Sequence, residues 1–181
     1  MEQFDLYNYD RSLSGKIMNR GTKVPEGLYR LVVYVCIFNS RGEMLIQQRQ
    51  TYKKSWSNLW DLTLGGHVQA GETSWQGANR ELLEELGLHH DFTGTPPAIT
   101  LTFTTGYDDY YLLQQDLEIS QLHFQKEEVQ GAKWASLDQI LKMIDDSTFI
   151  PYHKGFIQFL FAMKDKLTVH TREDWTKPEV Q

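Results

Sequence analysis

The strongest hydrophobic signal in the chain is an almost unbroken apolar run at residues 31–38, LVVYVCIF. Branched and aromatic residues dominate it, which favours a strand, and the lack of polar alternation favours a strand buried on both faces. Turn residues follow at 39–42, and residues 43–49 resume an apolar pattern. The sequence therefore predicts a central strand that continues through a β-hairpin into a partner strand.

Weaker strand signals flank this centre. Residues 5–9 and 15–19 surround a polar turn and predict an N-terminal β-hairpin, followed by a connecting loop that ends at Gly27. Farther along, alternating or branched and aromatic residues predict strands at 98–104, 110–119 and 132–135. The segment 106–109, GYDD, lies between the first two of these and is typical of a turn.

Helical periodicity is clearest at residues 73–86. Thr73, followed three residues later by Gln76, is a capping-box pattern, and Gly87 suits a left-handed stop. Apolar side chains recur there at spacings of three and four residues, which predicts a core-facing stripe made of Trp75, Ala78, Leu82 and Leu86.

Two further helices are predicted near the C-terminus. Residues 137–144 form the first, begun by Ser136 with Gln139 in the capping-box position. Residues 152–166 form the second, with an apolar face made of Phe156, Phe159, Leu160 and Met163. We therefore expect an α+β chain in three parts: a hairpin and loop at 1–27, a main domain at 28–167, and a polar, frayed tail at 168–181.

Composition narrows the classes of function. With 40% hydrophobic and 13% aromatic residues, the chain of 181 residues is expected to be globular. Its net charge of -6, without a long run of lysines or arginines, argues against nucleic acid as a partner. A net-negative protein can still bind a negative substrate when a divalent cation lies between them, so phosphate chemistry stays open.

Cysteine content and the chain start suggest a cytoplasmic protein. Cys36 is the only cysteine, which excludes an intramolecular disulfide, and its place in the apolar run predicts a buried thiol. The first residues, MEQFDLYNYD, lack a signal-peptide pattern, and no apolar run approaches about 18 residues, so no membrane contact is expected. Oligomeric state is open, with a homodimer paired through the N-terminal hairpin as one option.

A cluster of acidic residues lies off the apolar stripe of the 73–86 helix. Glu81, Glu84 and Glu85 follow Arg80 at spacings that let three carboxylates converge. One interpretation is a solvated acidic surface whose mutual repulsion Arg80 partly relieves. The other is a site for a hard divalent cation, which prefers oxygen ligands and can bridge to substrate phosphates.

The surrounding residues favour the cation site. Gly66, five residues, Glu72, seven residues, and then REL-x-EE-x-GL fill the nine fixed positions of the Nudix box: Gly66, Glu72, Arg80, Glu81, Leu82, Glu84, Glu85, Gly87 and Leu88. The chain thus resembles the Nudix hydrolase family. This resemblance implies the Nudix fold, a mixed β-sheet sandwiched between α-helices, here preceded by the N-terminal hairpin.

The resemblance also implies roles for the matched positions. Glu81, Glu84 and Glu85 match the metal-binding carboxylates, and Gly66 lets a backbone carbonyl approach the metal. Arg80 is expected to hold a neighbouring carboxylate, either Glu81 or Glu72. The expected cofactor is Mg²⁺, with Mn²⁺ as an alternative, and the expected reaction is attack of water on a small-molecule diphosphate, such as a nucleoside diphosphate linked to X.

The catalytic base is left open among several carboxylates. Glu81, Glu84 and Glu85 of the helix are candidates, and in many family members the base comes from a later loop instead. Glu128 and its neighbour Glu127 are the residues to consider here, and a solvated loop is the alternative interpretation for both.

A second resemblance is to the Nudix branch that contains isopentenyl diphosphate isomerase. Arg49 and Lys53 correspond to basic residues that contact the diphosphate there, and arginine suits such bidentate contacts. The isomerase's protonating cysteine is replaced by Gly65, and one of its metal-binding histidines by Arg30. We therefore expect the scaffold without the isomerase chemistry. His67 is a metal ligand or, alternatively, a hydrogen-bonding structural group.

Other polar and aromatic residues have two interpretations each. Asp108 and Asp109 could add carboxylates from the opposite rim, although turn chemistry explains them too. Trp56 and Trp60 could stack on a substrate but are expected to be core or loop anchors. The main hypothesis is a Mg²⁺-dependent Nudix hydrolase. Its rivals are an isomerase-type Nudix protein and a non-catalytic nucleotide-sensing domain.

Overall fold

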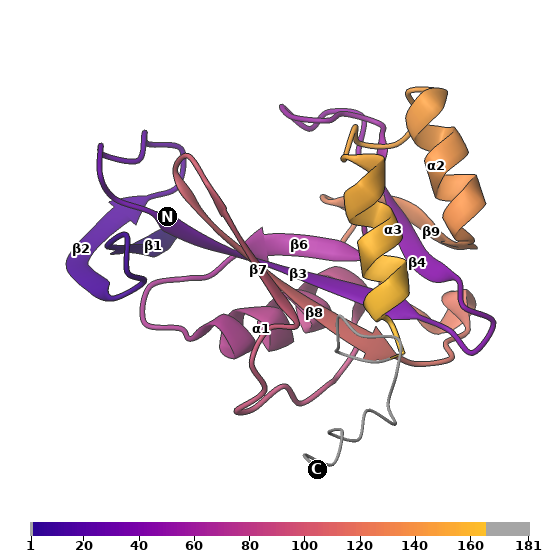
Figure 1. Ribbon diagram of the computed structural model, residues 1–181, viewed down its shortest axis with the longest axis horizontal. Helices are drawn as coiled ribbons and strands as arrows, with labels where there is room; N and C mark the ends of the chain where they lie inside the picture. Colours follow the sequence, from indigo (N-terminus) through magenta and orange to yellow (C-terminus); the bar gives the residue numbers. More distant parts are fainter. Residues whose placement is uncertain (1, 166–181) are drawn as a thin grey trace, which may run out of the picture.

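A seven-stranded mixed sheet forms the centre of the computed structural model, which describes residues 2–165 (Figure 1). The strand order is β5-β4-β3-β8-β7, with β6 paired to β3 and β9 to β4. The strands are β3 (Arg30–Phe38), β4 (Met44–Arg49), β5 (Trp60–Asp61), β6 (Leu64–His67), β7 (Ile99–Phe103), β8 (Gly106–Gln114) and β9 (Val129–Ala135). The apolar run therefore does lie at the middle of the sheet, as its composition predicts.

Helices cover both faces of this sheet. Helix α1 (Ser74–Leu86) lies on one side, and α2 (Leu137–Asp145) and α3 (Lys154–Met163) lie on the other (Figure 1). Strand β3 serves both layers: Val33 and Val35 pack with α1, whereas Cys36 and Phe38 pack with α2 and α3. This two-sided burial explains why the strand lacks polar alternation, and the arrangement confirms the predicted α+β architecture of a mixed sheet between α-helices.

The N-terminal hairpin forms a separate two-stranded sheet of β1 (Gln3–Tyr7) and β2 (Leu13–Asn19). Its own small core consists of Phe4, Leu6, Met18 and Val24. The hairpin is confirmed, with its first strand starting two residues earlier than predicted. The predicted tail at 168–181 lies outside the described residues.

The predicted hairpin between β3 and β4 is wrong beyond its tip. The two strands pair only at Phe38 and Met44, and β6 occupies the adjoining edge of β3. Thr63 bridges the gap, because its hydroxyl accepts a hydrogen bond from the Ile37 amide at 2.9 Å and donates one to the Leu45 carbonyl. Strand β4 pairs instead with β9 and β5.

The turn predicted at 106–109 is also wrong. These residues begin β8, which runs parallel to β3 from Arg30 opposite Gly106 onward. Gly106 is needed for a close approach of chains, because an added Cβ would lie 2.7 Å from the carbonyl oxygen of Arg30. Asp109 is fully buried within the strand.

Helices α1 and α2 match their predicted bounds to within one residue, whereas α3 is shorter than the predicted range 152–166. Thr73 caps α1 through a complete capping box, and Gly87 ends it at a φ of 68°. Ser136 caps α2 in the same way. The apolar face of α3 differs from the prediction: Phe159 is 38% exposed, and the buried positions are Ile157, Leu160, Phe161 and Met163. No helix among residues 2–165 is long and apolar enough to cross a membrane.

Candidate metal and diphosphate site

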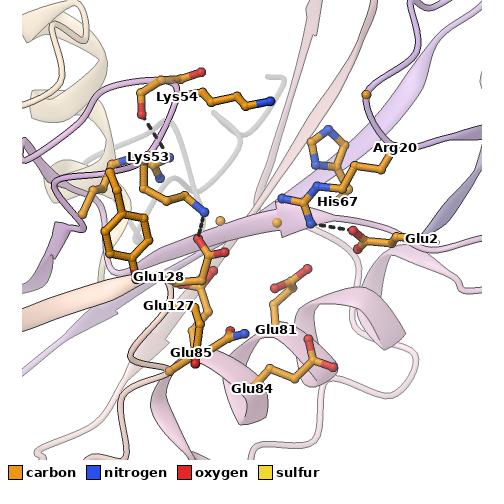
Figure 2. A pocket seen from close by; sticks show the side chains of 17 residues that line it. Glu2, Arg20, Lys53, Lys54, His67, Glu81, Glu84, Glu85, Glu127 and Glu128 are labelled. Atoms are coloured by element: carbon orange, nitrogen blue, oxygen red, sulfur yellow. Dashed lines mark hydrogen bonds and ion pairs between the residues drawn. The ribbon is translucent and has the colours of Figure 1, made fainter.

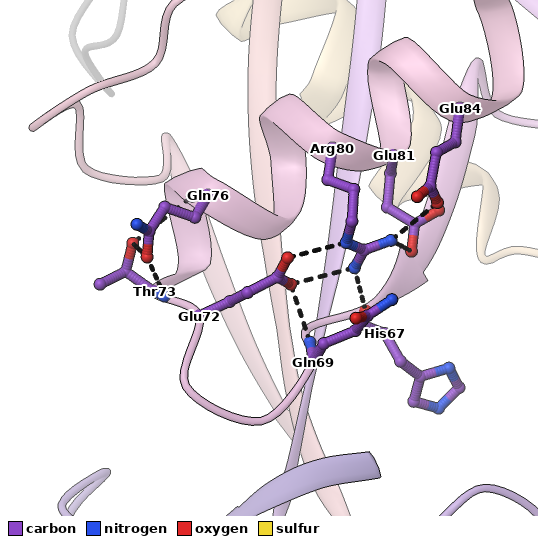
Figure 3. Close-up of polar contacts among 8 residues, drawn as sticks. All are labelled: His67, Gln69, Glu72, Thr73, Gln76, Arg80, Glu81 and Glu84. Carbon is purple, nitrogen blue, oxygen red and sulfur yellow. Dashed lines mark hydrogen bonds and ion pairs between the residues drawn. The ribbon is translucent and has the colours of Figure 1, made fainter. Parts of the chain in front are cut away.

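Arg80 lies at the centre of a polar network that joins α1 to the loop before it (Figure 3). Its Nε and Nη2 donate to the two carboxylate oxygens of Glu72 at 2.8 and 3.0 Å. Nη1 donates to Glu81 at 2.9 Å and to Glu84 at 3.0 Å, and Nη2 also donates to the carbonyl of His67 at 2.9 Å. The sequence left Glu72 and Glu81 as alternative partners of Arg80, and the structure contains both.

The three helix carboxylates differ in their exposure. The side chain of Glu84 is 49% exposed, but Glu81 and Glu85 are only 8% and 5% exposed, so the expected solvated face holds for Glu84 alone. Burial, together with the nearby charge of Glu81, raises the pKa of Glu85 to about 8, although the amide of Gln47 donates to it at 3.0 Å. Burial also raises the pKa of Glu81. Two buried carboxylates that repel one another are chemically suited to a shared cation.

Gly66 provides the space that the Glu81 carboxylate fills. A Cβ at this position would lie 2.0 Å from Cδ of Glu81 and 2.1 Å from its Oε1, so no other residue fits without displacing the carboxylate. Next to it, a Cβ on Gly65 would lie 2.6 Å from the ring of Tyr34. In β6, Gly65 thus faces an aromatic ring and Gly66 faces a carboxylate.

In this structure the carboxylates are not arranged as a complete set of ligands around one point. Within residues 2–165, no three His, Cys, Asp or Glu side chains are grouped so that they could hold a metal ion as they stand. Nη1 of Arg80 lies between Glu81 and Glu84 and contacts both. The donors are nevertheless all oxygens, which a hard cation such as Mg²⁺ prefers, and the missing side chain of Gly66 lets the Glu81 carboxylate lie against β6.

A cavity of about 790 Å³ opens above these carboxylates (Figure 2). Gly65, Gly66 and the three helix glutamates line one part of it. The loop after β4 and the segment before β9 line the opposite part, with Arg49, Tyr52, Lys53, Lys54, Ser55, Gln125, Glu127 and Glu128. The structure therefore gathers every predicted site residue except Glu72 and Arg80 at the cavity surface; Arg80 contacts Glu81 and Glu84, and Glu72 contacts Arg80.

The predicted diphosphate contacts are already paired with carboxylates. Nζ of Lys53 forms an ion pair with Glu128, and Nη1 of Arg49 lies 3.5 Å from Oδ2 of Asp61. Nε of Arg49 is buried and has no hydrogen-bond partner among the described residues. Because this atom is shielded from solvent, it is not itself exposed to the cavity.

His67 also lines the cavity, and its ring stacks on Phe4 with 4.7 Å between centroids. Its buried Nε2 has no partner within residues 2–165. Burial, and then the positive charges of Arg30 and Arg20, lowers the pKa of His67 to about 4. The imidazole is therefore neutral near pH 7.

Several residues weighed from the sequence lie away from the cavity. Asp109 is not at a rim: its carboxylate is buried and accepts from Arg11 at 2.9 and 2.8 Å, from Ser74 and from Thr100. Trp56 is 51% exposed, so it is not the expected anchor, whereas Trp60 packs in the α2–α3 core. Neither tryptophan lines the cavity.

Sequence reasoning missed the contribution of the N-terminal hairpin. Glu2 and Arg20 complete the wall of the cavity beside His67 (Figure 2), and Gly21 is a further lining residue. These residues lie in ordinary polar segments, and only the folded position of the hairpin brings them to the site. No local signal could have found them.

Comparisons with known proteins agree with this geometry. The family model for the NUDIX domain matches residues 28–158. An uncharacterized Nudix hydrolase of Listeria monocytogenes is 42% identical over 170 residues, which cover 94% of this chain and 99% of that protein. An isopentenyl-diphosphate Delta-isomerase of Pectobacterium atrosepticum is 31% identical over 133 residues, covering 68% of this chain and 71% of the other.

The fold has a solved counterpart as well. A crystal structure of a Deinococcus radiodurans protein superposes with a TM-score of 0.70 at 23% identity and covers 88% of this chain and 97% of its own. At that identity the likeness concerns the fold alone. Together with the intact box, the matched domain and the full-length relative, it shows that the chain belongs to the Nudix family as a hydrolase of pyrophosphate bonds.

Proposed function

We propose that this protein is a Mg²⁺-dependent hydrolase that cleaves the diphosphate linkage of a nucleoside diphosphate-X or related small molecule, with Mn²⁺ as an alternative cofactor. The observation that carries the proposal is the charge of the cavity. Six carboxyl groups line it, from Glu2, Glu81, Glu84, Glu85, Glu127 and Glu128, against four basic side chains, so acidic groups stay in excess even when Glu85, with its pKa of about 8, is protonated. A diphosphate would meet an excess of like charge there, which a divalent cation neutralises.

The residues that would hold such a cation are Glu81, Glu84, Glu85 and the backbone carbonyl of Gly66. When bound, the cation supplies neutralisation of the diphosphate charge and a water of lowered pKa. Arg80 keeps Glu81 in the space beside Gly66 by means of its 2.9 Å contact, while Glu72 fixes Arg80 from the other side. Glu84 is exposed enough to turn toward the cavity.

Two basic residues are placed to bind the diphosphate. Lys53 lies across the cavity from the α1 glutamates (Figure 2), and Arg49 lines the same cavity with a side chain that is 21% exposed. In binding substrate, Lys53 would exchange part of its ion pair with Glu128 for a phosphate contact. This exchange would leave the Glu128 carboxylate facing the cavity, where it can accept a proton from an attacking water.

The choice of base is then between Glu128 and the helix carboxylates Glu84 and Glu85. Glu85 is nearly inaccessible, at 5% exposure, and accepts a hydrogen bond from Gln47, so it is better placed as a ligand than as a base. Glu128→Gln should therefore lower kcat while leaving the affinity for Mg²⁺ near its native value. A normal kcat in that variant would exclude Glu128 as the base.

The proposal is tested by a metal-dependent screen for release of phosphate or nucleotide. The substrates are nucleotide sugars, dinucleoside polyphosphates, NADH, coenzyme A, nucleoside triphosphates and prenyl diphosphates, each with Mg²⁺, with Mn²⁺ and with excess chelator. We expect release from at least one diphosphate, abolished by chelator and by Glu84→Gln. Absence of metal-dependent release from the whole set would refute the proposal.

The isomerase alternative is supported by the 31% identity to an isopentenyl-diphosphate Delta-isomerase. Two observations weigh against it. Position 65 has no room for a cysteine side chain beside Tyr34, and the described residues that line the cavity include no aliphatic side chain for an isoprenoid group. Incubation with isopentenyl diphosphate should therefore yield no dimethylallyl diphosphate, and detection of that product would restore the alternative.

A further inference from the structure

The N-terminal hairpin contributes a charged wall to the active-site cavity. Residues Glu2, Arg20 and Gly21 line it, although the matched NUDIX domain begins only at residue 28. Arg20 follows the last residue of β2 directly, and Glu2 precedes the first residue of β1, so both lie at the open end of the hairpin. The family's own motif therefore does not account for this part of the cavity.

The hairpin is fixed to the loop that precedes α1. The amide of Ala70 donates to the carbonyl of Gln3 at 2.8 Å, and the amide of Gly71 donates to the carboxylate of Asp5 at 2.6 Å. Phe4 adds its stacking contact with His67. These contacts involve the segment between Gly66 and Glu72 of the Nudix box. These contacts therefore fix the position of Glu2 and Arg20 relative to the glutamates of α1.

The Arg20 guanidinium is oriented but not saturated. Its Nη1 forms an ion pair with Glu2 at 2.5 Å, and its backbone amide donates to the Glu2 carbonyl at 2.9 Å. Nε and Nη2 make no hydrogen bond with any described residue, and the side chain is 58% exposed. Free donors on a side chain held by a neighbouring carboxylate suit the recognition of a second anion.

Arg20 and Lys53 lie on opposite sides of the cavity, with the α1 glutamates between and below them (Figure 2). Because Lys53 and Arg49 are placed for the scissile diphosphate, Arg20 faces a different part of the substrate. That part meets Glu2, Arg20 and His67 and, among the described residues, no aliphatic side chain. The free donors of the Arg20 guanidinium are therefore the groups there that can bind an anionic substituent.

Resting on the proposed function, we propose that Arg20 is a specificity-determining residue that selects diphosphates carrying a further phosphate or carboxylate beyond the scissile linkage. The additional anion binds the free edge of the Arg20 guanidinium. Glu2 keeps that edge directed into the cavity and disfavours a second anion placed elsewhere on the wall. A substrate lacking the additional group would leave Arg20 paired only with Glu2.

The test uses pairs of compounds that differ by one anionic group. Coenzyme A and dephospho-coenzyme A differ by a phosphate, and UDP-glucuronate and UDP-glucose differ by a carboxylate. Dissociation constants are measured by calorimetry with Ca²⁺ in place of Mg²⁺ to suppress turnover, and kcat/KM is measured with Mg²⁺. The variants are Arg20→Gln and, as a matched control, Arg41→Gln, which breaks a surface ion pair with Glu43 away from the cavity.

We expect the native protein to bind at least one anionic member more tightly than its partner compound. Arg20→Gln should weaken that member by roughly 10- to 100-fold, the range of one charge-assisted hydrogen bond, with less than about twofold change for the other member. Arg41→Gln should leave both affinities unchanged. The phosphate and carboxylate pairs show separately which anion is selected.

Equal weakening of both members by Arg20→Gln would overturn the inference, because Arg20 would then contact the shared diphosphate. An absence of preference in the native protein for either anionic member would also overturn it. Neither result would contradict the proposed hydrolysis, which is tested separately by metal-dependent release of phosphate or nucleotide in the wider screen.

Discussion

Gly66→Ala tests whether the Glu81 carboxylate must occupy the space beside this glycine. The added Cβ would lie 2.0 Å from Cδ of Glu81 and 2.1 and 2.5 Å from its oxygens. Non-bonded carbon atoms need about 3.5–4.0 Å, so the carboxylate has to retreat by roughly 1.5 Å. That movement breaks its 2.9 Å contact with Nη1 of Arg80.

The expected magnitude follows from this displacement. A misplacement of about 1 Å in a catalytic site can cost about 100-fold, so kcat/KM with Mg²⁺ should fall by about 100-fold or more. Overpacking should lower the free energy of unfolding by about 1–3 kcal/mol, which leaves a folded protein to assay. Rates are measured on the best substrate from the screen, and stability by urea unfolding.

Gly77→Ala is the matched control. Its Cβ would lie 2.9 Å from Cγ2 of Val68, so it crowds the same helix but does not touch Glu81. Activity in this variant should stay near native. If Gly66→Ala also retained kcat/KM within about threefold of the native value, the position of the Glu81 carboxylate would be irrelevant to turnover and the site as described would be refuted.

Three further changes test other parts of the reasoning. Glu84→Gln should lower kcat by orders of magnitude at an almost unchanged melting temperature, because this side chain is 49% exposed; near-normal turnover would contradict its role. Leu82→Ala should lower the free energy of unfolding by about 2–5 kcal/mol, because Leu82 is fully buried, and unaltered urea unfolding would mean the core stripe is misplaced. The pKa of His67 is lowered from 6.5 to about 4, so between these pH values the unfolded chain binds more protons at this site and the contribution of His67 to stability falls as pH falls, opposite in sign to that of Glu85, whose pKa is raised to about 8. An imidazole NMR titration of the native protein with a midpoint near 6.5 would contradict that.

Local signals predicted the part of the fold that local interactions determine. The capping box of Thr73 and Gln76, the glycine stop at Gly87 and the stripe of Ala78, Leu82 and Leu86 all act within one helix, and the structure contains each of them. The spacing of Glu81, Glu84 and Glu85 likewise placed all three at one cavity. Their roles in metal binding and proton transfer stay predictions.

Long-range strand pairing and hairpin docking determined the features that the local sequence pattern did not predict. Residues 31–38 and 43–49 have the pattern of a hairpin, but the insertion of β6 and the bridging hydroxyl of Thr63 separate the two strands. The pair Asp108 and Asp109 suits a turn, but β8 buries Asp109 because Arg11 of the distant hairpin neutralises it. The cavity wall at Arg20 depends on the same docking and had no local signal.

The packing around Gly65 explains how a scaffold shared with an isomerase can serve hydrolysis. Tyr34 fills the space that a side chain at position 65 would need, and its ring stacks on Tyr110 at 4.7 Å between centroids. Tyr110 in turn contacts Phe156 of α3 at 5.0 Å between centroids. Placing a cysteine at position 65 would therefore require repacking from the sheet to α3. On the other face of β6, Gly66 leaves room for Glu81, so this one strand excludes a side chain at position 65 and admits the carboxylate that we propose as a metal ligand.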